Sequence, residues 1–121
     1  MLDYMRISEE YRYKTELHAH TKPVSLCSEI TPEEIVRAYY EYGCDTLTVT
    51  NHLNPDWTPS RTDEYLSGYY DTKKAAEGTG MNVVLGVEIR FTENANDYLV
   101  YGVSPGEIEK MIRLIPYGIT E

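Results

Sequence analysis

The apolar positions of the chain alternate between strand-like and helix-like spacing. Two-residue alternation and β-branched content predict strands over residues 15–20, 45–50, 82–91 and 98–103. Apolar side chains three and four residues apart predict helices over about 31–43, about 62–78 and from 104 onward. The order β-α-β-α-β-β-α indicates a mostly parallel sheet with helices packed on it.

Two of the predicted helices begin at capping boxes. Thr31 is followed by a proline and then, three residues on, by Glu34, and Ser104 is followed in the same way by Glu107. Gly43 ends the first helix because glycine readily adopts the left-handed backbone conformation beyond a helix end.

Each predicted strand has an apolar and a polar face, because successive side chains point to opposite sides. In the first strand, Leu17 and Ala19 share the apolar face, and Glu16, His18 and His20 share the polar one. The apolar face continues in the next two strands through Leu47, Val49, Val83, Leu85, Val87 and Ile89. A doubly covered parallel sheet would be apolar on both faces. A polar face instead suits a barrel that opens into a site at the carboxyl ends of its strands.

Size, charge and cysteine content exclude several classes of protein. A chain of 121 residues is one domain at most, and its net charge of −9 argues against binding to nucleic acid or to an anionic membrane surface. No apolar run approaches the roughly 18 residues of a membrane span, and the charged first twenty residues contain no signal-peptide core. Cys27 and Cys44 are too few for a disulfide framework, so we expect a cytoplasmic protein with reduced thiols.

The polar face carries a candidate metal site. His18-Ala19-His20 places two imidazoles about 7 Å apart along one strand, where both can converge on a cation. A single histidine at a strand end is usually a surface residue. Here, however, all three histidines of the chain, the third being His52, fall on the polar face at strand ends together with Glu88. Imidazole and carboxylate donors in this pattern predict a divalent metal site.

Three short segments carry a resemblance to a known family. Residues 16–21 (Glu-Leu-His-Ala-His-Thr), 50–52 (Thr-Asn-His) and 86–88 (Gly-Val-Glu) resemble the first three metal motifs of the polymerase and histidinol phosphatase (PHP) family. Members of that family are distorted seven-stranded β/α barrels that hold two or three zinc, manganese or iron ions and hydrolyse phosphate esters. The resemblance implies that His18 and His20 hold one metal, that His52 holds another and that Glu88 bridges two.

The chain departs from the family pattern in three ways. Asn51 stands where the family usually has aspartate, which implies altered tuning of the site rather than its loss. Cys27 lies one residue from a position that often holds a ligand histidine, so it is either a thiolate ligand or a loop cysteine with no chemical role. The family's further histidines and its Asp-x-His motif do not occur in the 121 residues.

Four strands cannot close a barrel that ordinarily takes about 250 residues. The expected fold is therefore an incomplete, PHP-like (β/α) barrel of about four strands and three helices. In this fold residues 1–14 are an N-terminal extension and residues 15–121 the N-terminal half of the metal-binding domain. The sheet edge left open favours pairing with a second copy of the chain.

The resemblance implies a metal-dependent phosphoesterase that attacks a small phosphorylated substrate with metal-activated water. Glu88 and Arg90 are the candidate catalytic residues, with Arg90 expected either to contact the substrate phosphate or to form a salt bridge. Activity is expected to be weak in this chain, which supplies only part of the family's ligand set. One alternative is a vestigial half-domain that binds metal without turnover. The other is an amidohydrolase-type metallohydrolase, which shares the first histidine motif but fits the second and third motifs less well.

Overall fold

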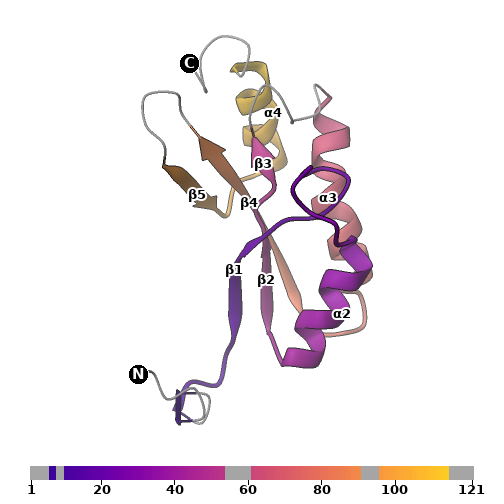
Figure 1. The fold of residues 1–121 in the computed structure, drawn as a ribbon, viewed down its shortest axis with the longest axis vertical. Coiled ribbons are helices and arrows are strands. Elements are labelled where there is room, and N and C mark those ends of the chain that lie inside the picture. Colours follow the sequence, from indigo (N-terminus) through magenta and orange to yellow (C-terminus); the bar gives the residue numbers. More distant parts are fainter. Residues whose placement is uncertain (1–5, 8–9, 54–60, 91–95, 115–121) are drawn as a thin grey trace.

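The computed structural model describes residues 6–7, 10–53, 61–90 and 96–114. The strands are β1 (Thr15–Ala19), β2 (Thr46–Val49), β3 (His52–Leu53), β4 (Asn82–Arg90) and β5 (Asp97–Tyr101). The helices among the described elements are α2 (Pro32–Tyr42), α3 (Thr62–Ala75) and α4 (Pro105–Leu114). Figure 1 shows these helices on one side of a twisted, open sheet. The expected α/β architecture, a mainly parallel open sheet with helices packed on it, is confirmed.

The sheet is mainly parallel. Its hydrogen-bonded order is β1-β2-β4-β3, with all these pairs parallel, and β5 pairs with β4 in the antiparallel direction. The long strand β4 is the centre, because β2 pairs with its first half and β3 with its second. The sequence pattern did not separate β3 as a strand of its own. Its two residues are too few to establish a period, and they are extended because they pair with Glu88 and Ile89.

The predicted capping boxes form at α2 and α4. At α2, Thr31 Oγ1 accepts a hydrogen bond from the Glu34 amide at 3.1 Å, and the Glu34 carboxylate accepts one from the Thr31 amide at 2.8 Å. Ser104 and Glu107 make the same reciprocal pair at α4, at 3.2 and 2.8 Å. Gly43 ends α2 with φ at 88°, a backbone conformation that side chains other than glycine rarely adopt.

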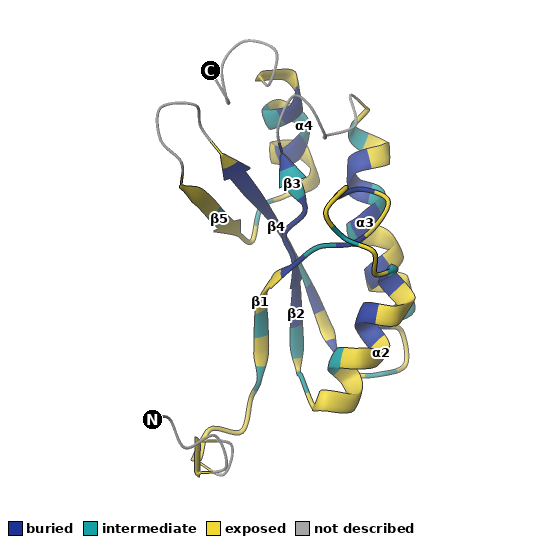
Figure 2. Cartoon of the chain, viewed as in Figure 1, coloured by how far each residue is buried: buried dark blue, intermediate teal, exposed yellow. Residues whose placement is uncertain are grey.

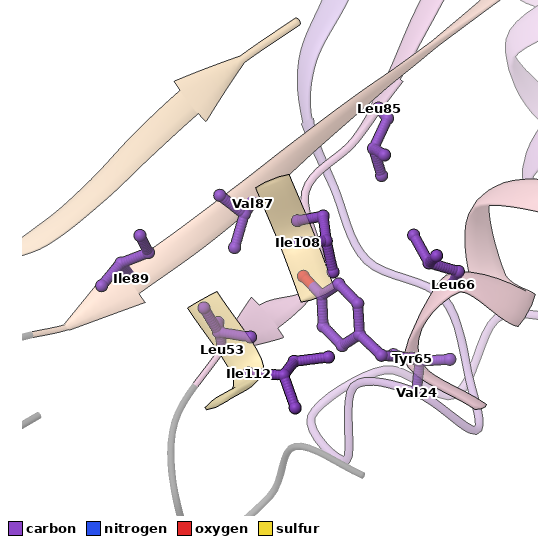
Figure 3. Packing of buried hydrophobic residues seen from close by; sticks show 9 residues of the cluster. All are labelled: Val24, Leu53, Tyr65, Leu66, Leu85, Val87, Ile89, Ile108 and Ile112. Atoms are coloured by element: carbon purple, nitrogen blue, oxygen red, sulfur yellow. The ribbon is translucent and has the colours of Figure 1, made fainter. Parts of the chain in front are cut away.

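The apolar face of the sheet is buried beneath the helices in two clusters. The cluster under α3 and α4, shown in Figure 3, contains Val24, Leu53, Tyr65, Leu66, Leu85, Val87, Ile89, Ile108 and Ile112. The cluster under α2 contains Ala19, Ile35, Val36, Leu47, Val49, Ala76, Met81 and Val83. Strand β4 contributes to both, as the predicted alternation of β2 and β4 requires. The helices therefore cover the apolar face, and Figure 2 shows most of β2 and β4 buried and most of β1 and β5 exposed or half-buried.

The predicted faces of β1 are wrong at Glu16 and Leu17. Glu16 pairs with Leu47 and Ala19 with Val49, so three steps along β1 match two along β2. This irregularity turns Glu16 to the helix side, where it interacts with Tyr39 of α2, and leaves Leu17 50% exposed. A β-bulge shifts the alternation by one residue, and a sequence pattern does not reveal it. His18 and His20 nevertheless lie on the predicted polar side.

The outer strands of the sheet are exposed. Tyr98, Val100 and Tyr101 of β5 are 41%, 37% and 43% exposed, which suits the predicted pairing with a second copy, and this pairing stays a prediction.

In the described part of residues 1–14, Tyr11 and Tyr13 are exposed, and the Lys14 amide donates to Asp45 at 2.9 Å. Among the described residues no helix has the length and apolar content required to cross a membrane.

Helix α3 approaches the carboxyl end of the sheet so closely that Gly68 is required. An alanine Cβ at this position would lie 2.5 Å from Asn51 Nδ2 and 2.6 Å from Thr21 Oγ1. We expect Gly68→Ala to lower the free energy of unfolding by about 1–3 kcal/mol through overpacking. The matched control is Gly106→Ala in α4, whose Cβ would meet only Ser104 Oγ at 3.9 Å and which should be neutral or stabilise by up to about 1 kcal/mol. Urea denaturation measures both, and equal stability of the two variants would contradict this close packing.

Candidate metal centre

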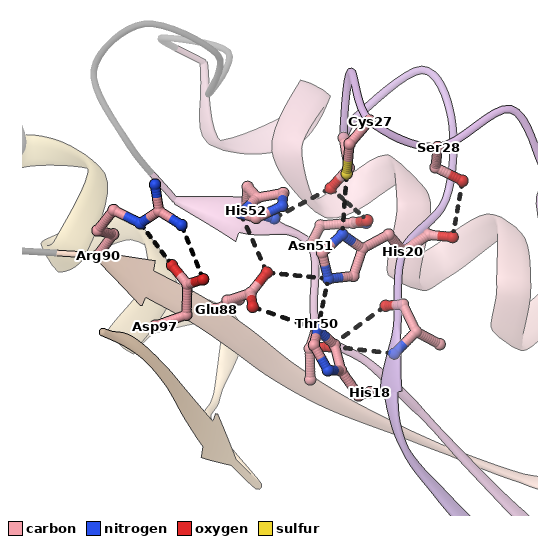
Figure 4. Close-up of polar contacts among 12 residues, drawn as sticks. His18, His20, Cys27, Ser28, Thr50, Asn51, His52, Glu88, Arg90 and Asp97 are labelled. Atoms are coloured by element: carbon pink, nitrogen blue, oxygen red, sulfur yellow. Dashed lines mark hydrogen bonds and ion pairs between the residues drawn. The ribbon is translucent and has the colours of Figure 1, made fainter. Parts of the chain in front are cut away.

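Three strands bring the predicted ligands together at the polar end of the sheet (Figure 4). His18 Nε2 lies 3.2 Å from Glu88 Oε1, and His20 Nε2 lies 3.0 Å from Glu88 Oε2. His52 Nδ1 lies 3.1 Å from the same Oε2, and the Nε2 atoms of His18 and His20 are 3.0 Å apart. The structure therefore gathers all three histidines around one carboxylate. We call these four residues the histidine–glutamate cluster.

Backbone pairing sets these positions. His52 of β3 and Glu88 of β4 are direct partners in a parallel ladder, so their side chains project to the same side. Between His18 and His20, Ala19 is fixed by Thr50, whose amide donates to the Ala19 carbonyl at 2.7 Å and whose Oγ1 accepts from the Ala19 amide at 3.1 Å. Three members of the cluster, His18, His52 and Glu88, therefore lie on strands, and His20 directly follows β1.

Glu88 is the least exposed member of the cluster. Its side chain is 5% exposed, against 49% for His18, 15% for His20 and 16% for His52. Its Oε2 atom is buried and receives no hydrogen bond from the described residues, although two imidazole nitrogens lie within 3.1 Å. Those nitrogens are therefore close to the carboxylate without directing an N–H at it. Imidazole nitrogens and a carboxylate that converge in this way form a donor set of the kind that binds a cation.

The protonation of His20 agrees with this arrangement. Burial, with the neighbouring rings of His52 and His18, lowers the pKa of His20 to about 4. The ring is therefore neutral at pH 7, the form in which one nitrogen offers a lone pair to a metal. The rings of His20 and His52 meet edge to face, with centroids 4.4 Å apart.

The loop after β1 adds Cys27 to the edge of the cluster. Cys27 Sγ lies 3.2 Å from His20 Nδ1, and ligand atoms of His20, Cys27 and His52 all lie within 4.8 Å of one another. Burial raises the pKa of the Cys27 thiol, with a smaller contribution from Glu88. The structure places Cys27 beside the histidines, and its direct role as a metal ligand stays a prediction.

A groove of about 560 Å³ opens in front of the cluster. It is lined by His18, His20, Cys27, Ser28, Glu29 and Ile30. The volume is in the range of small-molecule sites. The exposed edge of the cluster is therefore accessible to a small substrate.

Asn51 connects the segments that carry the ligands. Its Oδ1 accepts hydrogen bonds from the Thr21 amide at 2.8 Å and from Ser25 Oγ at 2.9 Å, and its Nδ2 donates to Thr21 Oγ1 at 3.0 Å. Ser25 Oγ in turn accepts from the His52 amide at 3.0 Å, and the Asn51 carbonyl accepts from the Glu88 amide at 3.1 Å. Asn51 thus holds the residues next to three ligands in place.

Arg90 is not brought into the cluster. Its guanidinium forms a two-pronged ion pair with Asp97 of β5, with Nε–Oδ1 at 2.7 Å and Nη2–Oδ2 at 2.8 Å. The two residues face each other across β4 and β5, and Arg90 lowers the pKa of Asp97. The structure thus contains the salt bridge named as the alternative for Arg90, and its catalytic role stays a prediction.

Several residues that build the site had no clear signal in the sequence. Ser25 and Tyr65 act through Asn51, since the buried Tyr65 hydroxyl donates to the Asn51 carbonyl at 2.7 Å. Gly68 makes room for the Asn51 amide from α3. From the sequence Tyr65 is either a residue at the mouth of the site or a core residue, and its spacing gives no indication that its hydroxyl binds Asn51.

The donor set fits a divalent metal ion. Three imidazoles and one carboxylate suit zinc, manganese or iron, and His18, His20 and Glu88 offer ligand atoms within 4.8 Å of one another. A cation would also satisfy the buried Glu88 Oε2 atom. The sharing of Glu88 between two metals stays a prediction.

Comparisons with known proteins agree with this arrangement. The family model of the PHP domain matches residues 16–121. Among the solved structures, a candidate metal-dependent phosphoesterase from Bifidobacterium adolescentis aligns with a TM-score of 0.54 at 18% sequence identity. The alignment covers 84% of this chain and 32% of that chain, so the present sequence spans about a third of that protein's length. No curated protein matches at a significant level.

Removing the Asn51 side chain should lower the stability of the fold and loosen the segments that carry the cluster. In Asn51→Ala the buried Thr21 amide loses its acceptor, and we expect the free energy of unfolding to fall by about 1–3 kcal/mol. The control is Asn82→Ala, because Asn82 is exposed at the start of β4. Urea denaturation gives the stabilities. Equal values for Asn51→Ala and Asn82→Ala would show that Asn51 does not hold these segments together.

Proposed function

Because the chain belongs to the PHP domain family, we propose that its histidine–glutamate cluster binds divalent metal ions and hydrolyses phosphate esters. The observation that carries this proposal is the buried Glu88 Oε2, which lies within 3.1 Å of two imidazole nitrogens yet receives no hydrogen bond from the described residues. Burying a carboxylate without compensation is costly, and a cation bound among these atoms would provide that compensation.

Each residue of the cluster has a proposed role. His18 and His20 would hold one ion and His52 another. Glu88 would be shared between them, since its Oε1 lies beside His18 and its Oε2 beside His20 and His52. A bound divalent ion polarises a phosphoryl group and lowers the pKa of a coordinated water molecule.

The proposed substrate is a small phosphate ester. The 560 Å³ groove beside His18 and His20 offers it access, and the net charge of −9 means that positive charge for the phosphate must be concentrated locally. Arg90 lies two residues beyond Glu88 on β4 and is the proposed second contact for the phosphate. Because its guanidinium is bound to Asp97, it must exchange that carboxylate for the substrate.

A metal-binding domain without turnover is the second candidate. The observation that favours it is the small donor set of the cluster in the described residues, three imidazoles and one carboxylate. Few ligands hold a metal weakly and position it poorly for in-line attack. Metal binding and activity are therefore measured separately below.

Metal binding should depend on the cluster. We expect the His18→Ala, His20→Ala double variant and Glu88→Gln each to show a marked loss of bound zinc or manganese, because each removes donors from the same centre. Glu33→Gln is the matched control, since Glu33 is an exposed carboxylate in the first turn of α2. Isothermal titration and elemental analysis give affinity and stoichiometry. Unchanged stoichiometry in the double variant would mean that the metal binds elsewhere.

Turnover by the chain alone should be weak or absent. The assay is phosphate release from an aryl phosphate and from histidinol phosphate with added manganese or zinc. Rates near those of typical enzymes, about 1–10³ per second, would contradict the expectation. If turnover is observed, repeating the assay over a range of protein concentrations shows whether one chain or an assembly of two copies is active. Specific activity that rises with concentration indicates that a second copy completes the site, and constant activity indicates that one chain is sufficient.

A further inference from the structure

The two nitrogens of His20 face different partners. Nε2 points into the cluster, 3.0 Å from both Glu88 Oε2 and His18 Nε2. Nδ1 points the other way, to Cys27 Sγ at 3.2 Å (Figure 4). His20 is therefore the residue through which Cys27 and the buried carboxylate are connected.

The chemistry of a neutral imidazole limits what each nitrogen can do. One nitrogen carries the proton and the other carries the lone pair. If Nε2 gives its lone pair to a metal beside Glu88, the proton must lie on Nδ1. That N–H is then directed at the Cys27 sulfur, which is a hydrogen-bond acceptor and a stronger one as a thiolate.

The loop that carries Cys27 is held in place over His20. Ser28 Oγ donates to the His20 carbonyl at 3.0 Å, the Lys22 amide donates to the Ile30 carbonyl at 2.9 Å, and the Ser25 amide donates to the Thr21 carbonyl at 2.9 Å. Ser25 is itself bound to Asn51. The sulfur position is therefore defined by the same network that positions the ligands.

We propose that Cys27 is a positioning residue whose sulfur accepts the Nδ1–H of His20 and thereby holds Nε2 toward Glu88 and His18. This inference rests on the proposed metal-binding function. Histidine ligands commonly donate their second N–H to a carboxylate or a carbonyl oxygen, and this contact fixes the tautomer and the orientation of the ring. Here a sulfur atom takes that place.

The geometry favours this role over direct coordination by the sulfur. The nitrogen of His20 that faces Cys27 is Nδ1, whereas Nε2 faces Glu88. A metal held between Cys27 and Nδ1, in addition to one at Nε2, would require the neutral ring of His20 to lose its one N–H proton and become an imidazolate. His52 Nδ1 likewise lies on the carboxylate side, 3.1 Å from Glu88 Oε2.

The test compares zinc and cobalt binding in four forms of the chain. Zinc affinity should fall about 10–100-fold in Cys27→Ala, because the second N–H of His20 loses its acceptor. Cys27→Ser should restore most of the affinity, since its oxygen can accept the same hydrogen bond. Cys44→Ala is the matched control and should bind zinc as the native chain does, because Cys44 lies outside the cluster, against the core beneath α2.

Cobalt provides a readout that separates positioning from coordination. The cobalt-loaded native chain should lack the intense near-ultraviolet band of sulfur-to-cobalt charge transfer. Nitrogen-detected spectra of the zinc-loaded chain should show His20 protonated at Nδ1. A charge-transfer band that disappears in Cys27→Ala would overturn the proposal and make Cys27 a direct ligand.

Other results would also overturn the positioning role of Cys27, and they distinguish its failure from failure of the proposed metal-binding function. Native zinc affinity in a folded Cys27→Ala variant would show that the sulfur does not position His20, while metal binding by the cluster would stand. Loss of affinity in Cys27→Ala that serine does not restore would likewise remove the acceptor role. Failure of the native chain to bind any metal would overturn the proposed function and this inference together.

Discussion

The burial of one carboxylate determines how the polar end of this sheet is organised. Glu88 is 4% exposed and has three imidazole nitrogens within 3.2 Å. The ring of His20 does not neutralise this carboxylate by protonation, because its pKa lies at about 4. A buried carboxylate oxygen without a hydrogen-bond donor is costly, and a bound cation would compensate Glu88 Oε2. Metal binding and folding are therefore expected to be linked in this region.

The scaffold keeps that carboxylate in place by using both faces of β4. Val87 and Ile89 pack beneath α3 and α4, while Glu88 between them points to the opposite side. Close approaches reinforce the arrangement, because a Cβ at Gly86 would meet Thr50 Cγ2 at 2.9 Å and the Val100 carbonyl oxygen at 2.8 Å. The apolar core and the metal centre are thus two sides of one strand, and a change in its register would disrupt both.

Covering one face of the sheet leaves the site open. The helices bury the apolar side, and the groove before His18 and His20 remains accessible on the polar side. Exposed apolar side chains of β5 and the exposed Leu17 of β1 lie on the outer strands. The solved phosphoesterase to which the chain is similar is about three times as long as the aligned part. The outer strands β1 and β5 therefore present edges at which a further strand can pair.

Local patterns were sufficient to predict most of the elements and the ligands. The caps at Thr31 and Ser104, the alternation in β4 and the three histidines at strand ends all depend on neighbours within a few residues, so the sequence alone predicted them. Their convergence on Glu88 was predictable too, because parallel strands bring their carboxyl ends to one edge.

Features that depend on contacts between distant segments were decided by the tertiary structure. The bulge in β1 turned Glu16 toward Tyr39, the two-residue strand β3 formed only by pairing with β4, and Asp97 engaged Arg90 across an antiparallel pair. The roles of Asn51 and Gly68 likewise arise from segments 14 to 47 residues apart meeting at one point. Sequence determines which groups are available and on which side of a strand regular alternation places them. Only packing decides register, close approach and hydrogen-bond partners, because these depend on the distance between atoms that the chain order does not encode locally.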